Sequence, residues 1–116
     1  MVEAYGLAAR FPPIERYGLA AQIRRASVSV VANVAEGHGR AHRGEYRYHL
    51  SVAHGSLMEL ETEIIAATRL GYISDGDAGA FAALAGEVGR LLNGLARALA
   101  TARPRHPDPR SPVPDP

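Results

Sequence analysis

The sequence predicts an all-α fold of four helices, and three observations lead to this prediction. Three long segments repeat apolar residues at the spacing of an α-helix. Glycines and prolines separate these segments where helices are expected to end and begin. A shorter segment, residues 2–10, comes first and places Ala4, Leu7 and Ala8 at helical spacing. At 116 residues the chain is expected to form one domain with a modest core.

The first long helix is expected within residues 15–37. Pro12 and Pro13 suit its first turn or the loop before it, and Gly37 suits its C-terminal cap. The run SVSVV could form a strand on its own, but the helical period on both sides outweighs it. The face expected to be buried consists of Leu19, Ile23, Ser27, Val30 and Val34.

The second long helix is expected within residues 44–71, with Gly71 as its cap. Its apolar residues recur alternately three and four positions apart over about seven turns, as in a helix packed along its whole length. After it, Ser74 and Asp77 have the spacing of a capping box for the third long helix. The seam of the second helix consists of Tyr46, Leu50, Ala53, Leu57, Leu60, Ile64 and Ala67.

The third long helix carries a further seam, which begins at Phe81 and ends at Leu99. It also contains glycines, each of which costs roughly 0.5–1 kcal/mol relative to alanine. Its stability is therefore expected to depend on packing. Across the three long helices, the residues expected to be buried are Leu19, Ile23, Val30, Val34, Leu50, Leu57, Leu60, Ile64, Leu84, Val88, Leu91 and Leu95.

The two ends of the chain are expected to differ from the central helices. The first two long helices would span roughly 33 and 39 Å at 1.5 Å per residue, and the N-terminal helix could cover barely half of that. Residues 1–102 are therefore expected to form a bundle with a shortened first helix. Residues 103–116 contain six prolines in fourteen residues and are expected to form a disordered tail.

Composition excludes several classes of protein. Cysteine is absent, which excludes disulfides and thiolate catalysis. No run of about 20 apolar residues could span a membrane. The first residues lack the basic and apolar regions of a secretory signal. We therefore expect a cytoplasmic protein without a membrane partner.

The charges are unevenly distributed along the chain. Residues 16–47 contain six arginines and two glutamates, a net charge of +4, whereas residues 59–87 contain six acids and one arginine, a net charge of −5. One half could meet an anion, and the other could meet the first half of a neighbouring copy. All thirteen basic residues are arginines. The absence of lysine has two possible explanations. One is codon bias, and the other is a need for the planar contacts that arginine makes to phosphate and carboxylate.

Residues 33–46 combine glycines, arginines and histidines, but they do not fit a phosphate loop or a metal site. A Walker-type loop would need a preceding strand and a Gly-Lys-Ser/Thr ending. Di-iron bundles use Glu-x-x-His pairs on two helices, and this chain has no such pair. No cofactor and no metal are expected. The side chains that could act as metal ligands are His38, His42, Glu45, His49 and His54.

Carboxylates and hydroxyls do not form a catalytic pattern either. Glu59 and Glu63 share a helix face opposite the leucine seam. A solvated face or an ion pair with a neighbouring copy fits them better than acid–base chemistry does. The serines lack a recognisable neighbouring base. The chain is therefore not expected to be an enzyme.

Residues 33–46 are interpreted first as a connection between two helices. Two glycines end one helix, and Gly44 with Glu45 begins the next, where an acidic side chain is favourable. The arginines nearby form either a solvated charged turn or an anion-binding patch. These arginines are Arg40, Arg43 and Arg47.

Several short motifs follow one another through residues 11–74. They are Phe11-Pro12, Glu15 to Leu19, Gln22 to Ala26, Val28 to Val30, Asn33 to Gly37, Gly39-Arg40, Gly55-Ser56, Glu59 to Thr62 and Leu70 to Ile73. With these motifs in this order, the sequence resembles the 23S rRNA-intervening sequence proteins, also called four helix bundle proteins. The C-terminal helix matches that family in pattern only.

The resemblance implies an antiparallel up-down four-helix bundle that assembles as a ring, a homopentamer. It implies no enzymatic activity. A related group, the accessory variability determinant proteins of diversity-generating retroelements, binds RNA and a reverse transcriptase through basic surfaces. The partners expected on this basis are further copies of the chain and either RNA or DNA, a reverse-transcriptase-like protein or a ribosomal component.

Two hypotheses for the function follow. The leading one is a non-enzymatic oligomeric bundle that binds RNA, or a nucleic-acid-processing partner, by arginine contacts to phosphates. The alternative is a purely structural assembly module, in which arginines of one copy pair with Glu59, Glu61 or Glu63 of the next. The predicted nucleic-acid-binding residues are Arg24, Arg25, Arg40, Arg43 and Arg47.

Overall fold

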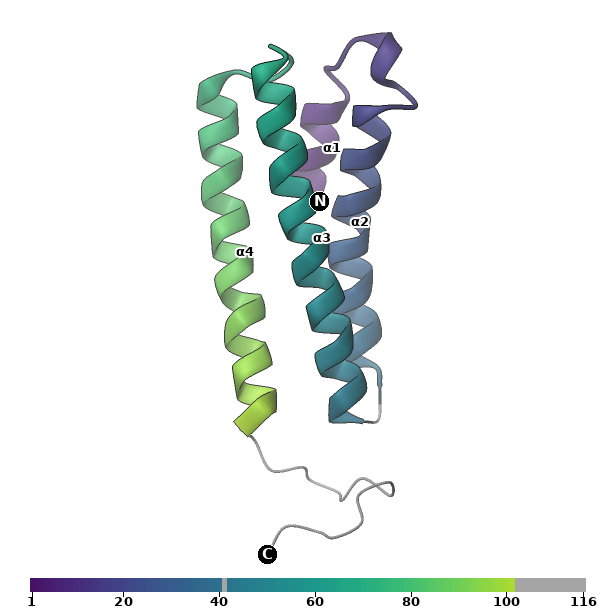
Figure 1. Cartoon of the computed structure of the whole chain (residues 1–116), viewed down its shortest axis with the longest axis vertical. Coiled ribbons are helices and arrows are strands. Elements are labelled where there is room, and N and C mark those ends of the chain that lie inside the picture. Colours follow the sequence, from purple (N-terminus) through teal and green to yellow (C-terminus); the bar gives the residue numbers. More distant parts are fainter. Residues whose placement is uncertain (41, 102–116) are drawn as a thin grey trace, which may run out of the picture.

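Four α-helices and one short 3₁₀ helix follow one another in the computed structural model, which describes residues 1–40 and 42–101 (Figure 1). The described residues contain no strand, which confirms the all-α prediction. The tail predicted over residues 103–116 lies outside the described residues. The elements are α1 (Val2–Ala8), η1 (Pro13–Glu15), α2 (Leu19–His38), α3 (Arg43–Arg69) and α4 (Asp75–Thr101).

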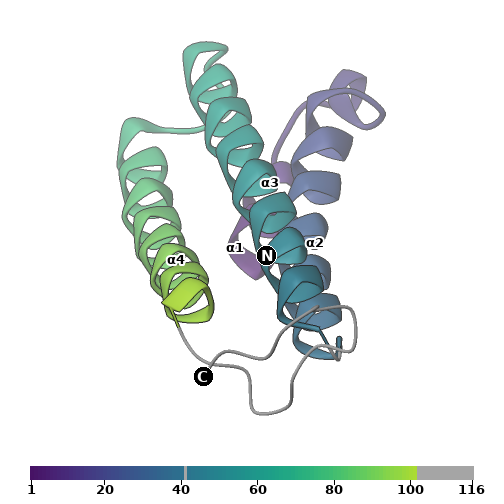
Figure 2. The same cartoon turned by 60° about the horizontal axis from the view of Figure 1, so that its bottom comes forward.

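The three long helices run side by side, each antiparallel to the one before it (Figures 1 and 2). α3 lies in the middle and packs against both α2 and α4, while α1 packs against α2. We call the end where α2 begins the upper end and the end where α2 turns into α3 the lower end (Figure 1). None of the described helices is long and apolar enough to cross a lipid bilayer.

α1 covers only the upper part of the bundle. It has seven residues, which corresponds to about 10 Å of helix at 1.5 Å per residue. Its buried residues are Ala4, Leu7 and Ala8, as the sequence predicts. The N-terminus lies about half-way down the bundle, so the lower half contains three helices (Figure 1).

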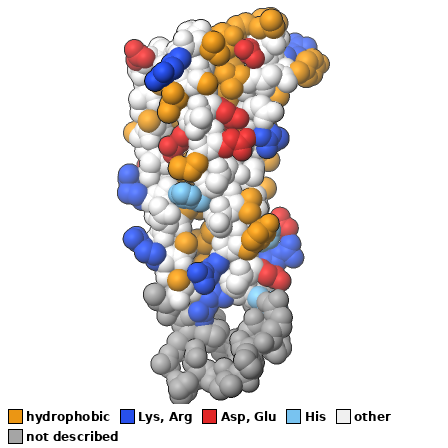
Figure 3. Space-filling model, viewed as in Figure 1, with side chains coloured by type: hydrophobic (Ala, Val, Ile, Leu, Met, Phe, Trp, Pro, Cys, Tyr) orange, Lys and Arg blue, Asp and Glu red, His pale blue; other side chains and the backbone are white. Residues whose placement is uncertain are grey.

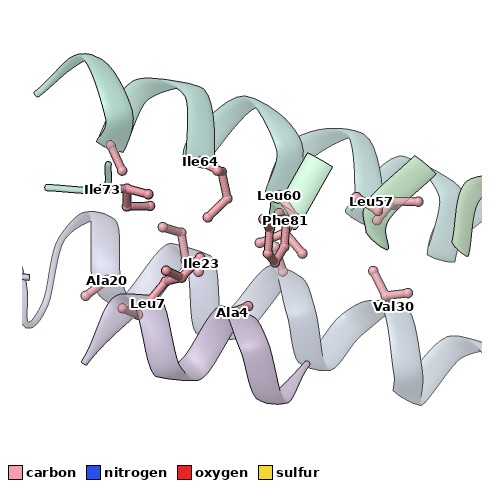
Figure 4. Close-up of a cluster of buried hydrophobic side chains, with 14 of the residues drawn as sticks. Ala4, Leu7, Ala20, Ile23, Val30, Leu57, Leu60, Ile64, Ile73 and Phe81 are labelled. Atoms are coloured by element: carbon pink, nitrogen blue, oxygen red, sulfur yellow. The ribbon is translucent and has the colours of Figure 1, made fainter. Parts of the chain in front are cut away.

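The core lies along the seams of α2 and α3, and both predicted seams are confirmed. Leu50, Leu57 and Ile64 of α3 are buried, and Tyr46 packs against them at the lower end. On α2, Ile23 is fully buried, and Leu19 and Val34 are partly buried at the two ends of the seam. Figure 4 shows how side chains from all four helices meet in this core.

The buried face of α4 differs from the predicted one. Leu84 and Leu91 are expected in the core, but they are 36% and 69% exposed. Ala85 and Leu92 are buried instead. The turn after Gly71 rotates α4 so that the side with Ala85 and Leu92 packs against α3. Leu91, on α4, is left exposed.

Both ends of α2 differ in detail from the sequence prediction. The helix begins at Leu19 rather than at Glu15, and the Glu15 Oε1 atom accepts a hydrogen bond of 3.1 Å from the Leu19 backbone amide. At the other end, the predicted cap Gly37 is still helical, and Gly39 is the cap. Gly37 is buried against α3, where an added Cβ would lie 2.8 Å from the Cβ of His49. Close packing of two helices therefore explains this glycine.

The turn between α3 and α4 has the predicted chemistry. Gly71 adopts a left-handed conformation with φ of 82°. The Tyr72 amide donates to the Ala67 carbonyl over 2.9 Å, and the Gly71 amide donates to that of Thr68 over 3.0 Å. This pair of bonds is a Schellman motif. The Ser74 hydroxyl accepts from the Asp77 amide over 3.1 Å, which confirms Ser74 as the cap of α4.

Candidate nucleic-acid interface

The structure separates the five predicted arginines into two groups. Arg24 and Arg25 lie in the second turn of α2, near the upper end. Arg40, Arg43 and Arg47 lie in the turn after α2 and in the first turns of α3, at the lower end. At 1.5 Å per residue, about 20 Å of α2 separates the groups. They do not form one continuous patch.

The upper arginines are engaged within their own chain. The Arg25 guanidinium forms an ion pair of 2.5 Å with Glu59 of α3 and also donates to the side-chain oxygen of Gln22. Arg24 donates to the backbone carbonyl of Arg16 over 3.1 Å. The alternative hypothesis assigns such an ion pair to a neighbouring copy. For Arg25 and Glu59 the ion pair forms within one chain, where it links α2 to α3.

A second acidic residue lies beside this ion pair. Burial raises the pKa of Glu63, the charge of Glu59 raises it further, and Arg25 lowers it in part. The Glu63 Oε1 atom is buried and has no hydrogen-bond partner among the described residues. The upper part of the α2–α3 surface therefore combines paired and unpaired carboxylates, which is unfavourable for a nucleic acid.

The lower arginines differ in their partners. Arg40 forms an ion pair of 2.6 Å with Glu36, one helical turn earlier. Arg43 is half-buried, and its Nη2 atom has no hydrogen-bond partner within the described part of the chain. Arg47 is exposed, and no acidic side chain of the described residues pairs with it. Arg43 and Arg47 are thus the predicted arginines best placed to receive an anion.

Arg47 lies at a groove between the lower halves of α3 and α4. The groove has a volume of about 400 Å³. Leu50 and Leu92 line it and are buried, so they form its floor. Its polar lining comes from both helices and consists of Arg47, Ser51, His54 and Asn93. Guanidinium, hydroxyl, imidazole and amide groups can all donate hydrogen bonds to phosphate oxygens.

The sequence prediction did not include two arginines of α4. Arg97 lies one turn beyond Asn93, and Arg90 lies nearly one turn before it; both are exposed. Figure 3 shows that arginine side chains gather over the lower halves of α3 and α4 on the face in view. The sequence could have indicated these arginines through the expected antiparallel pairing of the two helices, which brings residues 47–54 beside residues 92–97.

Comparison with protein families identifies the family of the chain. The family model described as 23S rRNA-intervening sequence protein matches residues 1–94, from before α1 into the last third of α4. The chain belongs to this family. A comparison with curated proteins finds no match.

Several motif residues that carry the resemblance to the 23S rRNA-intervening sequence proteins hold α2 against α3. The hydroxyls of Ser29 and Ser56 form a hydrogen bond of 2.7 Å across the two helices. Asn33 donates to the Ser29 carbonyl over 2.9 Å, and its Oδ1 atom lies 3.0 Å from Nδ1 of His49. Because the Asn33 oxygen can only accept, Nδ1 of His49 carries the proton. Together with Gly37, these residues show that several of the family motifs serve the packing of α2 against α3.

The histidines weighed for metal binding do not form a cluster. His49 bonds to Asn33, and His38 lies 3.4 Å from the Tyr46 hydroxyl. Within residues 1–40 and 42–101, no three histidine, aspartate or glutamate side chains are grouped as a metal site would require. The lower groove is therefore the best-supported candidate site of this family member, because its lining carries several hydrogen-bond donors.

Proposed function

We propose that the chain is a non-enzymatic helical module that binds RNA through the lower groove between α3 and α4. The observation that carries this proposal is the state of Arg43 and Arg47. Neither has an acidic partner among the described residues, and Arg43 keeps a buried guanidinium nitrogen without a hydrogen bond. Arg47 is exposed and lines the groove, so its guanidinium can donate to a phosphate oxygen there.

The surroundings of the groove support the same proposal. Arg47, Ser51 and Asn93 supply donors from two helices, and the nearby arginines of α4 add positive charge. Contacts of this kind are made to the phosphate backbone, so binding is expected to depend on salt and little on sequence. Arg25 is a poorer candidate because Glu59 already neutralises it.

The same module is proposed to assemble with further copies of itself, as a ring of five by resemblance to its family. Leu91 and Val31 are 69% and 48% exposed. Large apolar side chains that gather on a surface commonly mark an interface. The exposure of Leu91 on α4 and of Val31 on α2 favours self-assembly as the second candidate function, and a ring would multiply the phosphate contacts of each copy.

The test of RNA binding compares two double variants with equal loss of charge. Affinity for a labelled RNA of about 16 nucleotides is measured by fluorescence anisotropy over a range of KCl concentrations. The wild-type chain is expected to bind more weakly as salt rises, with a log–log slope of about −0.7 for each phosphate contact on a single strand. Arg43→Gln with Arg47→Gln is expected to reduce the steepness of that slope by about 1.4.

Arg24→Gln with Arg25→Gln is the matched control, because it removes the same charge from the upper end. It is expected to leave the slope nearly unchanged. Circular dichroism of both variants checks that helix content is retained. Equal slopes for the lower pair, the upper pair and the wild type would show that the groove does not carry the binding.

A further inference from the structure

One aromatic side chain is exposed beside the groove. Tyr48 follows Arg47 on α3, and its side chain is 65% exposed. Its neighbours one helical turn before and after are Gly44 and Ser51, and both line the groove. The Tyr48 ring meets that of His49 edge-on, with ring centroids 5.4 Å apart. This contact orients the tyrosine ring while leaving most of it accessible.

The backbone around Tyr48 is also open. A Cβ added at Gly44 would meet no atom within 4 Å, other than its chain neighbours and the nearby backbone of its own helix. The surface beside the ring is therefore bare on the groove side. A flat group that approaches the ring over Gly44 would meet no side chain at that position. The phosphate contacts proposed above make no use of this ring.

The shape of the groove limits what can enter it. Its donors, such as Arg47 and Asn93, stand around a floor of buried leucines in a cavity of about 400 Å³ between two helices. A duplex is a convex rod with its bases stacked inside, so its phosphates could meet the rim but not the floor. A single strand can turn its backbone into the groove and splay a base onto an apolar or aromatic surface.

We infer that the groove takes single-stranded nucleic acid, and that Tyr48 stacks on a base adjacent to the phosphate held by Arg47. This inference rests on the proposed function, since it names the form of nucleic acid that the same groove binds. Every base has a flat aromatic face, so stacking on Tyr48 keeps the binding insensitive to sequence. The ring supplies a contact that salt does not screen.

The experiment compares one RNA strand of about 16 nucleotides with the same strand annealed to its complement. The proteins are the wild-type chain, Tyr48→Ala, Tyr48→Phe and Tyr17→Ala, which removes an exposed tyrosine near the upper end. Tyr48→Phe keeps the stacking ring. Affinities are measured by fluorescence anisotropy over a range of KCl concentrations.

The single strand is expected to bind at least tenfold more tightly than the duplex. Tyr48→Ala is expected to weaken binding of the single strand about tenfold, within the range for one stacked base. Its salt slope should not change, because no charge is removed. Tyr48→Phe and Tyr17→Ala should behave as the wild-type chain does.

Two results would overturn the inference and leave the proposed function standing. One is salt-dependent binding of the duplex with the same affinity as the single strand. The other is an unchanged affinity of Tyr48→Ala for the single strand. If neither RNA binds at low salt, the proposed function itself is wrong, and the inference is wrong with it.

Discussion

Glu15 connects three parts of the chain through one carboxylate. Its Oε1 atom accepts from the Leu19 amide at the start of α2, and its Oε2 atom accepts from the Tyr72 hydroxyl over 2.9 Å. Tyr72 in turn packs against the ring of Phe11, with centroids 5.2 Å apart. A side chain at Gly18 would collide with this carboxylate, since an added Cβ would lie 2.7 Å from Oε1. The residues around Glu15 therefore form one unit.

Glu15→Ala is expected to lower the free energy of unfolding by about 0.5–2 kcal/mol, the range for a lost helix cap. Tyr72→Phe removes the other hydrogen bond and is expected to cost about 1 kcal/mol. Because the two residues are in contact, the double variant should lose less than the sum of the single variants. Urea unfolding of all four proteins measures this coupling. Strictly additive losses would mean that the two bonds are independent.

Glu63 gives the stability a dependence on pH. Burial is the main reason that its pKa is raised in the folded chain, and Glu59 adds to the effect. The folded chain therefore binds this proton more tightly than the unfolded chain does. The resulting stability is fully present below the ordinary carboxyl pKa of about 4.3 and is lost as pH rises through the raised pKa.

Glu63→Gln keeps the shape of the side chain and removes its charge. The variant is expected to have a higher Tm than the wild-type chain at pH 7, because a buried charge without a full set of partners is unfavourable. The gain should shrink at acid pH, where Glu63 of the wild-type chain is protonated. Thermal unfolding at both pH values measures the gain. An equal gain at the two pH values, or a lower Tm at pH 7, would contradict this explanation.

The contact between α2 and α3 depends on a position without a side chain. Gly37 lies where α2 packs closely against α3, and Tyr46 and His49 occupy the space beside it. Sequence patterns suggest that Gly37 is a helix cap. A capping glycine and a glycine that lets two helices pack closely can both lie near a helix end. Only the position of α3 shows that the reason is the distance between two helices.

Gly37→Ala is expected to lower the free energy of unfolding by about 1–3 kcal/mol, because the added methyl group overpacks the interface. Gly55→Ala is the matched control: it lies in the middle of α3, on its exposed side, and an added Cβ has no neighbour within 4 Å. It should stabilise the chain by roughly 0.5–1 kcal/mol, the helix preference of alanine over glycine. Stabilisation by both substitutions in urea unfolding would refute the close-packing explanation.

The sequence predicts the buried faces of α2 and α3 correctly and that of α4 only in part. α2 and α3 each have one apolar stripe, so the helical period determines which side of the helix is buried. α4 has two adjacent leucines, Leu91 and Leu92, and its period fits two different faces. The choice between them depends on where α3 and α1 lie, which no local pattern contains.

The candidate site was predictable to a similar degree. The concentration of arginines near the turn after α2 is visible in the sequence. That Arg25 pairs with Glu59 and that Arg47 faces Asn93 depend on the register of three antiparallel helices. Residue types therefore indicate the kind of chemistry, and the packing of helices decides which residues are available for it.

Along the length of the molecule, the charges of α3 are unevenly distributed. Arg43 and Arg47 lie near the lower end of this helix, whereas Glu59 and Glu63 lie toward its upper end. Along α3, an approaching polyanion would be attracted more strongly to the lower end than to the upper end. This difference would favour contact of a nucleic acid with the lower end of the helix.

Self-association is predicted from the lower half of the bundle, where α1 does not reach. Leu91→Gln is expected to shift the chain toward the monomer in sedimentation at tens of micromolar, with little change in unfolding free energy, because the side chain is 69% exposed. The adjacent Leu92→Ala is expected to cost about 2–5 kcal/mol of stability, as for a buried leucine. A wild-type chain that sediments as a monomer under these conditions would rule out an interface here.

The shortness of α1 also has a consequence for how the molecule opens. A helix of seven residues has almost no stability of its own in water, so α1 stays folded only while Leu7 and its neighbours remain against α2. One exposed ion pair of 3.1 Å, between Arg10 and Asp77, joins the segment after α1 to α4. Detachment of α1 leaves the direct contacts of α3 with α2 and with α4 in place. Backbone amides of α1 would then exchange with deuterium through local opening, whereas those in the middle of α3 would exchange mainly when the whole chain unfolds.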